Sequence, residues 1–180
     1  MAGLLRVSDA IDAISRLLAL IGAWLVLVSC LISAGNATSR YLFSASSNAW
    51  LEIQWQMFAG IFLLTAPWVL KVNEHVRVDL FYGMASHRRK LWIDVIGIVF
   101  FLFPTTIMIG WMSWGFFLSS YQTGEVSSNA GGLPVWPVKF LLPFGMAMLF
   151  LQGVSELVKR VAALRGDVDD TITDYEKPLQ

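Results

Sequence analysis

Four runs of uncharged, mostly apolar residues follow one another along the chain, separated by short polar connections. As an α-helix the first run rises roughly 34 Å, enough to cross a hydrocarbon core about 30 Å thick. The last run is shorter, but neighbouring apolar residues can extend its helix, and Lys139 can reach the membrane interface. The pattern predicts an all-α integral membrane protein with four transmembrane helices, at residues 17–39, 53–70, 95–124 and 140–155.

Composition agrees with a membrane protein. Hydrophobic residues make up 56% of the chain and charged residues only 14%, and the mean hydropathy is +0.62, unlike a soluble domain. The net charge is zero, so no overall field favours a nucleic-acid partner. Cys30 is the sole cysteine, which excludes a disulfide framework and a thiolate metal cluster. The first apolar run is longer than the apolar region of a cleaved signal peptide, so we do not expect the N-terminus to be one.

The distribution of basic residues predicts the orientation. Of the 13 Lys and Arg residues, only Arg40 and Lys139 lie in the first and third connections, and the others lie near the termini or in the middle connection. Cytoplasmic segments carry the excess of Lys and Arg, so we expect both termini in the cytoplasm. Residues 1–165 then form a single four-helix domain, and residues 166–180 an acidic, mobile tail.

The middle connection contains "KVNEHVRVDLFYG", residues 71–83, between two strongly apolar segments. Its mixture of apolar and charged positions predicts a short interfacial helix between the second and third spans. His75 and Asp79 are four residues apart, so on a helix they share a face and could share a metal ion. Such a site needs two more ligands, and only Glu74 and the distant His87 are available. The ligand count favours an ion-pair network at the headgroup level, which includes Arg77.

Small and polar residues line one face of the first predicted helix. A repeat of 3.6 residues per turn keeps them on one stripe. Such stripes let helices approach closely and form hydrogen bonds in lipid, where apolar attraction between helices is absent. We expect these faces to serve both packing within the chain and contact with a partner protein. The first stripe is Ser15, Gly22, Ser29, Ser33, Asn36 and Arg40, and the next helix has a similar face of Glu52, Gln56, Ala59, Gly60 and Leu63.

The spans lack the groups that carry chemistry in other small membrane proteins. No ionisable residue lies deep in any predicted span, whereas a proton-coupled four-helix exporter needs an acidic residue there. A haem-bearing anchor needs histidines within its spans, and both histidines here lie in the middle connection. "NAGGLP" predicts a turn rather than a phosphate-binding loop. We therefore expect no enzyme, with no catalytic residue, metal or cofactor; a stand-alone exporter and a redox-complex membrane anchor are the alternatives.

Several short motifs occur in an order that resembles a known family. They are "RYLF" at 40–43, "WLEIQW" at 50–55 and "NEHVRVDLFYG" at 73–83. Their order and spacing resemble the small membrane subunit, the DctQ type, of TRAP (tripartite ATP-independent periplasmic) transporters, from about residue 10 to 163. The segment "GEVSSNAGGLPVWPVKFLLP" at 124–143 is similar to the branch associated with uptake of oxo-acids or related carboxylates.

The resemblance implies a subunit that works within a complex in the bacterial inner membrane. In that family a large DctM-type subunit carries the sodium and substrate sites and moves as an elevator, while a periplasmic substrate-binding protein delivers the substrate. The small subunit widens the fixed scaffold and contacts membrane lipids. No substrate-binding residue is then expected in this chain.

Candidate residues for structural or partner contacts lie mainly around the second span. Arg40 and Glu52 are predicted to meet at the periplasmic ends of the first two spans and to form an ion pair. Trp50 is expected near the interface, and Trp55 deeper, packed against helices. The full set of candidates is Ser29, Ser33, Asn36, Arg40, Trp50, Glu52, Trp55, Gln56, His75, Arg77 and Asp79.

Overall fold

The computed structural model describes residues 2–73, 85–129 and 131–166. Within these ranges the chain is helical, apart from its connections and an isolated β-bridge between Val126 and Pro134. The predicted interfacial helix falls largely at 74–84, and the predicted tail at 167–180, outside the described residues. The helical elements are α1 (Ala2–Phe43), α2 (Asn48–Lys71), α4 (His87–Gly97), η1 (Ile98–Leu102), α5 (Phe103–Thr123) and α6 (Trp136–Arg165).

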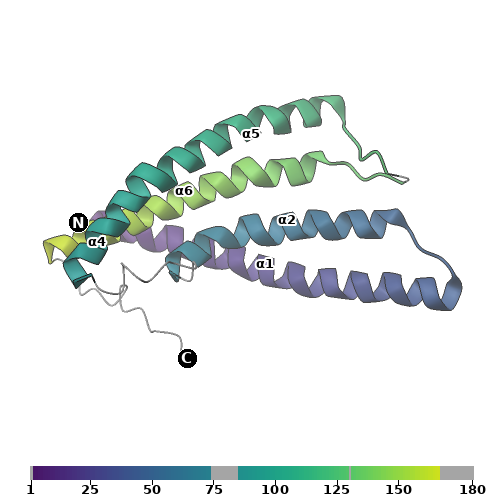
Figure 1. Ribbon diagram of the computed structural model, residues 1–180, viewed down its shortest axis with the longest axis horizontal. Helices are drawn as coiled ribbons and strands as arrows, with labels where there is room; N and C mark the ends of the chain where they lie inside the picture. Colours follow the sequence, from purple (N-terminus) through teal and green to yellow (C-terminus); the bar gives the residue numbers. More distant parts are fainter. Residues whose placement is uncertain (1, 74–84, 130, 167–180) are drawn as a thin grey trace.

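The prediction of four spans is confirmed. Within the described residues, four helices are long and apolar enough to cross a membrane: α1, α2, α6, and a continuous third helix made of α4, η1 and α5. Figure 1 shows two helical hairpins, α1–α2 and α5–α6, whose connections lie at the same end of the molecule. We call this end, with connections 44–47 and 124–135, the hairpin end. The opposite, terminal end holds the start of α1, the ends of α2 and α6, and α4.

Helices α1, α2 and α6 pack against one another, and α5 lies on α6. Glycines allow the closest approaches. A Cβ atom on Gly22 would lie 2.4 Å from Thr65 Cγ2, and one on Gly145 would lie 2.9 Å from Leu63 Cβ and 3.0 Å from its carbonyl oxygen. Because real Cβ atoms do not come so close, a larger residue at either position would push α2 away from α1 or α6.

The small-residue stripe of α1 is partly an internal seam. Ser15, Gly22 and Ser29 repeat every seven residues and are buried, as is Asn36 one repeat later. Ser33 and Arg40 are exposed. Residues spaced by seven stay on the seam between two supercoiled helices. Ser33 and Arg40 each follow a seam residue by four positions, which rotates them about 40° away from the seam. The stripe predicted as one face therefore divides into a buried seam and exposed neighbours.

The third span contains a π-helical turn at η1, where Phe103 N–H bonds to the carbonyl of Ile98. Pro104 follows directly and lacks the N–H that a regular helix requires. The wider turn moves the hydrogen-bond register just before this proline, and the α4–η1–α5 helix curves in Figure 1. Pro67 and Pro143 lie buried inside α2 and α6.

Candidate functional site

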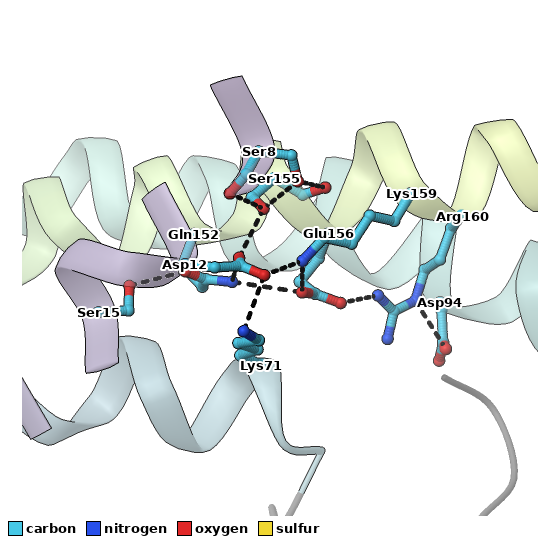
Figure 2. Close-up of polar contacts among 10 residues, drawn as sticks. All are labelled: Ser8, Asp12, Ser15, Lys71, Asp94, Gln152, Ser155, Glu156, Lys159 and Arg160. Carbon is cyan, nitrogen blue, oxygen red and sulfur yellow. Dashed lines mark hydrogen bonds and ion pairs between the residues drawn. The ribbon is translucent and has the colours of Figure 1, made fainter. Parts of the chain in front are cut away.

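A cluster of buried polar and charged side chains joins all four spans at the terminal end (Figure 2). We call it the polar clasp. Two of its members have large side chains that are almost completely buried: Gln152 is 0% exposed and Glu156 is 1% exposed. Its residues are Ser8, Asp12 and Ser15 of α1, Lys71 of α2, Asp94 of α4, and Gln152, Ser155, Glu156, Lys159 and Arg160 of α6.

The clasp exists because polar residues recur at helical spacing on two facing helices. On α6, residues 152, 155, 156, 159 and 160 are three, one, three and one apart, which places them on one face. On α1, residues 8, 12 and 15 are four and three apart and form the matching face. The clasp therefore follows the α1–α6 contact for about two turns.

Asp12 is the centre of the clasp. Its Oδ2 atom forms ion pairs with Lys159 Nζ at 2.6 Å and with Lys71 Nζ at 2.9 Å. Its Oδ1 atom accepts hydrogen bonds from Gln152 Nε2 at 2.9 Å and from Ser155 Oγ at 3.0 Å. One carboxylate thus connects α1 to α2 and to α6.

The second half of the clasp connects the third span to α6. Arg160 donates from Nε to Asp94 Oδ2 at 2.9 Å and also pairs with Glu156. Glu156 Oε1 is in turn 3.1 Å from Lys159 Nζ, so the two halves share one network. Figure 2 shows acidic and basic side chains alternating from Lys71 through Arg160 to Asp94. Each carboxylate therefore faces at least one cation.

Neutral side chains complete the network. Ser8 Oγ and Ser155 Oγ are 2.5 Å apart, and Ser15 Oγ donates to Gln152 Oε1 at 2.7 Å. Burying an ion is costly unless it is paired and its remaining hydrogen bonds are made. In the described part of the chain no clasp atom is buried without a partner. The clasp meets the condition under which buried charges hold a structure together.

The arrangement suits adhesion between helices. Asp12, Asp94 and Glu156 carry one negative charge each, and Lys71, Lys159 and Arg160 balance them. Among the described residues, no three His, Cys, Asp or Glu side chains lie close enough to hold a metal ion. Every carboxylate of the clasp is engaged by at least one cation.

A second polar contact lies at the hairpin end and is centred on Glu52. This residue, 2% exposed, lies in the first turns of α2. Its Oε1 accepts from Asn129 Nδ2 at 2.8 Å, and its Oε2 from the Leu133 backbone N–H at 2.7 Å. Gln56, one turn later, donates to the carbonyl of Pro134 at 3.2 Å. Helix α2 thereby holds the α5–α6 connection against the bundle.

The glycines of "NAGGLP" fit this turn. Gly131 has φ +77°, the left-handed region that favours glycine, and a Cβ on Gly132 would lie 2.1 Å from the carbonyl oxygen of Ser127. At the base of the same connection, Glu125 pairs with Lys139. The hydrogen bond from Lys139 lowers the pKa of Glu125 below its usual 4.5.

The predicted ion pair between Arg40 and Glu52 is wrong. Arg40 is exposed, and no ion pair joins these two residues among those that the structure describes. Glu52 lies one turn inside α2 and faces the α5–α6 connection, which supplies neutral donors from Asn129 and the Leu133 backbone. The topology placed the two residues at the same end of the bundle but did not determine which neighbour each one meets.

The other candidates lie in different environments. Ser29 and Asn36 are buried and Ser33 is exposed. Trp50 and Trp55 are 50% and 43% exposed, so Trp55 is less enclosed by this chain than expected. The metal or ion-pair hypothesis for His75, Arg77 and Asp79 falls on residues outside those the structure describes.

Sequence reasoning missed the clasp. It ended the last apolar run at Ser155 and counted Lys159 and Arg160 among the cytoplasmic charges near the C-terminus, whereas α6 continues to Arg165. It began the first run at Leu17, whereas α1 already includes Ser8 and Asp12. The signal was present in the helical spacing of polar residues beyond both apolar runs.

A comparison with protein families decides the classification. The family model for the DctQ component of tripartite ATP-independent periplasmic transporters matches residues 29–163. The chain belongs to the DctQ family. This makes it a multi-pass membrane component of a transporter, as the motifs indicated. The match covers the α6 half of the clasp, through Arg160, and begins after Ser8, Asp12 and Ser15. No curated protein matched the chain.

Proposed function

We propose that this DctQ chain is the fixed membrane subunit of a TRAP transporter that couples uptake of an organic carboxylate to sodium. In this proposal a large DctM-type subunit binds sodium and substrate and moves, and a periplasmic protein delivers the substrate. The chain itself binds neither solute. Its family membership and the carboxylate-branch resemblance of residues 124–143 support the proposal.

The polar clasp is the observation that carries the scaffold role. A subunit that stays fixed beside a moving domain must resist separation of its own helices. Asp12 links α1 to α2 and α6, and Arg160 links the third span to α6, so all four spans meet in one network. Large apolar side chains cover the outer faces of the helices, which provides wide contact with lipid or with a partner chain.

We also propose that the terminal end, with the clasp, faces the cytoplasm of a bacterial inner membrane. The support is the concentration of Lys and Arg at the termini and in the middle connection. Residues 1–165 then act as one membrane domain. In the middle connection, His75, Arg77 and Asp79 would fix the depth of the second and third spans at the headgroups.

Reconstitution tests the proposal directly. Proteoliposomes with an inward sodium gradient are prepared with this chain alone, with the large subunit alone, and with both. The periplasmic binding protein and a panel of radiolabelled carboxylates are then added. We expect accumulation only when both membrane subunits are present. Solute transport by this chain alone would support an exporter instead, and a haem or flavin that copurifies stoichiometrically would support a redox anchor.

A further inference from the structure

A groove at the terminal end is lined by α1 and the last turn of α2 and has a volume of about 760 Å³. It borders the polar clasp, from which Asp12 and Lys71 contribute to its lining. Two further charged residues of α1, Asp9 and Arg16, line the groove and take no part in the clasp. The apolar wall of the groove includes Leu17 and Leu20 of α1 and Trp68 of α2.

Asp9 and Arg16 carry opposite charges that the described part of the chain does not neutralise. Both residues are exposed, and neither forms an ion pair with another described residue. They are seven positions apart, which separates them by about 10 Å along the helix axis. Asp12, which lies between them, already pairs with Lys71 and Lys159. The groove therefore presents one cation and one anion to a ligand that carries both charges.

The order of groups along α1 matches the order of groups in a zwitterionic phospholipid. Residues 17–39 are uncharged, so α1 enters the hydrocarbon near Leu17 and Arg16 lies at the edge of the hydrocarbon. Arg16 is then at the depth of the lipid phosphates, and Asp9 is about two turns further out. In phosphatidylethanolamine the acyl chains, the phosphate and the ammonium group follow one another in the same direction. The match holds whichever side of the membrane the terminal end faces.

The neighbouring residues fit a phospholipid headgroup. A guanidinium such as that of Arg16 holds two phosphate oxygens at once. Lys71 adds positive charge beside it, since its side chain is 30% exposed and its Nζ lies 4.9 Å from the centre of the Trp68 ring. Tryptophan is enriched at the depth of the headgroups. The small, exposed Ala13 lines the groove between Asp9 and Arg16 and leaves space for the headgroup.

We propose that this groove binds phosphatidylethanolamine, with the lipid phosphate on Arg16 and the lipid ammonium group on Asp9. An acyl chain lies along Leu17 and Leu20. The inference goes beyond the proposed function, because it concerns a lipid site of this chain and depends on no solute. Phosphatidylglycerol offers the phosphate but no ammonium group, and phosphatidylcholine offers a positive charge that donates no hydrogen bond. These two lipids therefore separate the contact at Arg16 from the contact at Asp9.

Native mass spectrometry of the purified chain measures the affinity for each lipid. The chain is stripped of lipid by detergent exchange, and dioleoyl forms of the three phospholipids are added one at a time. We expect phosphatidylethanolamine to bind about fivefold more tightly than the other two, as for one additional exposed ion pair. Equal affinity for the three lipids would overturn the proposal.

Arg16→Gln removes the contact with the phosphate. We expect the affinity for all three lipids to fall about tenfold, because a charge-assisted hydrogen bond to phosphate is lost. Arg6→Gln is the matched control, since Arg6 is exposed on the same helix and does not line the groove. The control should bind lipid as the wild type does. An equal loss in both variants would show general attraction of basic residues to phosphate and would overturn the proposal.

Asp9→Asn removes the contact with the ammonium group alone. We expect the affinity for phosphatidylethanolamine to fall to that for phosphatidylglycerol, about fivefold. A preference for phosphatidylethanolamine that persists in this variant would overturn the assignment of Asp9. Neither Asp9 nor Arg16 forms a hydrogen bond or ion pair with a described residue, so both variants should melt with the wild type in lipid-free detergent. Added phosphatidylethanolamine should then raise the melting temperature of the wild type more than that of either variant.

Photo-cross-linking identifies the occupant of the groove in the native membrane. A benzophenone amino acid replaces Leu20, which is 56% exposed and lines the groove. After irradiation of membranes that contain the chain and the large subunit, we expect the chain to carry one phospholipid, identified by mass spectrometry as phosphatidylethanolamine. The yield should fall when Arg16→Gln is added. Cross-linking to the large subunit or to a second copy of this chain would overturn the proposal.

Discussion

The two ends of the bundle are held together by different chemistry. At the terminal end, side chains from all four spans meet in a charge-balanced network around Asp12 and Arg160. At the hairpin end, Glu52 bonds to Asn129 and to the backbone of the α5–α6 connection. The terminal end therefore holds helix to helix, whereas the hairpin end holds a connection to a helix.

Of the substitutions considered, removing Arg160 should lower the stability of the bundle most. Arg160→Met leaves the buried carboxylates of Glu156 and Asp94 without their main cation, and we expect a loss of about 3–5 kcal/mol in the free energy of unfolding. Unfolding in mixed micelles, followed by circular dichroism, measures it. Arg165→Met, in an exposed position one turn further on, should change stability by less than about 0.5 kcal/mol. Equal effects of the two variants would show that the clasp does not hold the spans.

A substitution of Asp12 tests whether the residues that α1 contributes to the clasp also stabilise the bundle. Asp12→Asn keeps the shape of the side chain but removes the charge that pairs with Lys71 and Lys159, and we expect a loss of about 2 kcal/mol in the same assay. Asp9→Asn is the control, because Asp9 is exposed on the same helix. If the Asp12 and Asp9 variants have the same free energy of unfolding, the stabilisation by the clasp comes from the contacts between α6 and α4 alone.

Glu52 should give a local effect at the hairpin end. Glu52→Gln keeps one acceptor for Leu133 N–H but loses the charge, so we expect amide exchange at residues 131–135 to become about tenfold faster while global unfolding changes little. Hydrogen exchange with mass spectrometry measures it. Arg40→Gln should leave this exchange unchanged, because Arg40 does not pair with Glu52. A matching effect of Arg40→Gln would restore the ion pair that the structure contradicts.

Acidification should give the smallest effect, confined to the base of the α5–α6 connection. Lys139 lowers the pKa of Glu125, so the native state holds the proton of Glu125 less tightly than the unfolded state does. The resulting stabilisation is present above pH 4.5 and is lost as the pH falls through the lowered pKa. Protection of the backbone amides of the α5–α6 connection from hydrogen exchange should decline as the pH falls below 4.5. The Glu125→Gln variant should not show this decline. A decline that persists in Glu125→Gln would assign the titration to another group.

Local sequence determined the membrane architecture. The length and hydropathy of the four apolar runs were sufficient to place four spans, because a membrane helix satisfies its own backbone hydrogen bonds and depends mainly on the composition of one segment. The turn at "NAGGLP" was likewise predictable, because Gly131 has a left-handed backbone conformation and the backbone around Gly132 leaves no room for a side chain. The order of short motifs was sufficient to indicate the DctQ family, which the family match confirmed.

The partners of the polar residues were decided only by the tertiary structure. Asp12 and Lys159 are 147 positions apart in the chain, and Glu52 and Asn129 are 77 apart, so no local pattern links them. The sequence reasoning paired Glu52 with Arg40 from topology alone and counted Arg160 among the cytoplasmic charges near the C-terminus, because a charge beyond an apolar run looks the same whether it faces water or another helix. Whether such a charge is buried depends on the rotation of each helix about its axis, which is set by packing at residues such as Gly22 and Gly145.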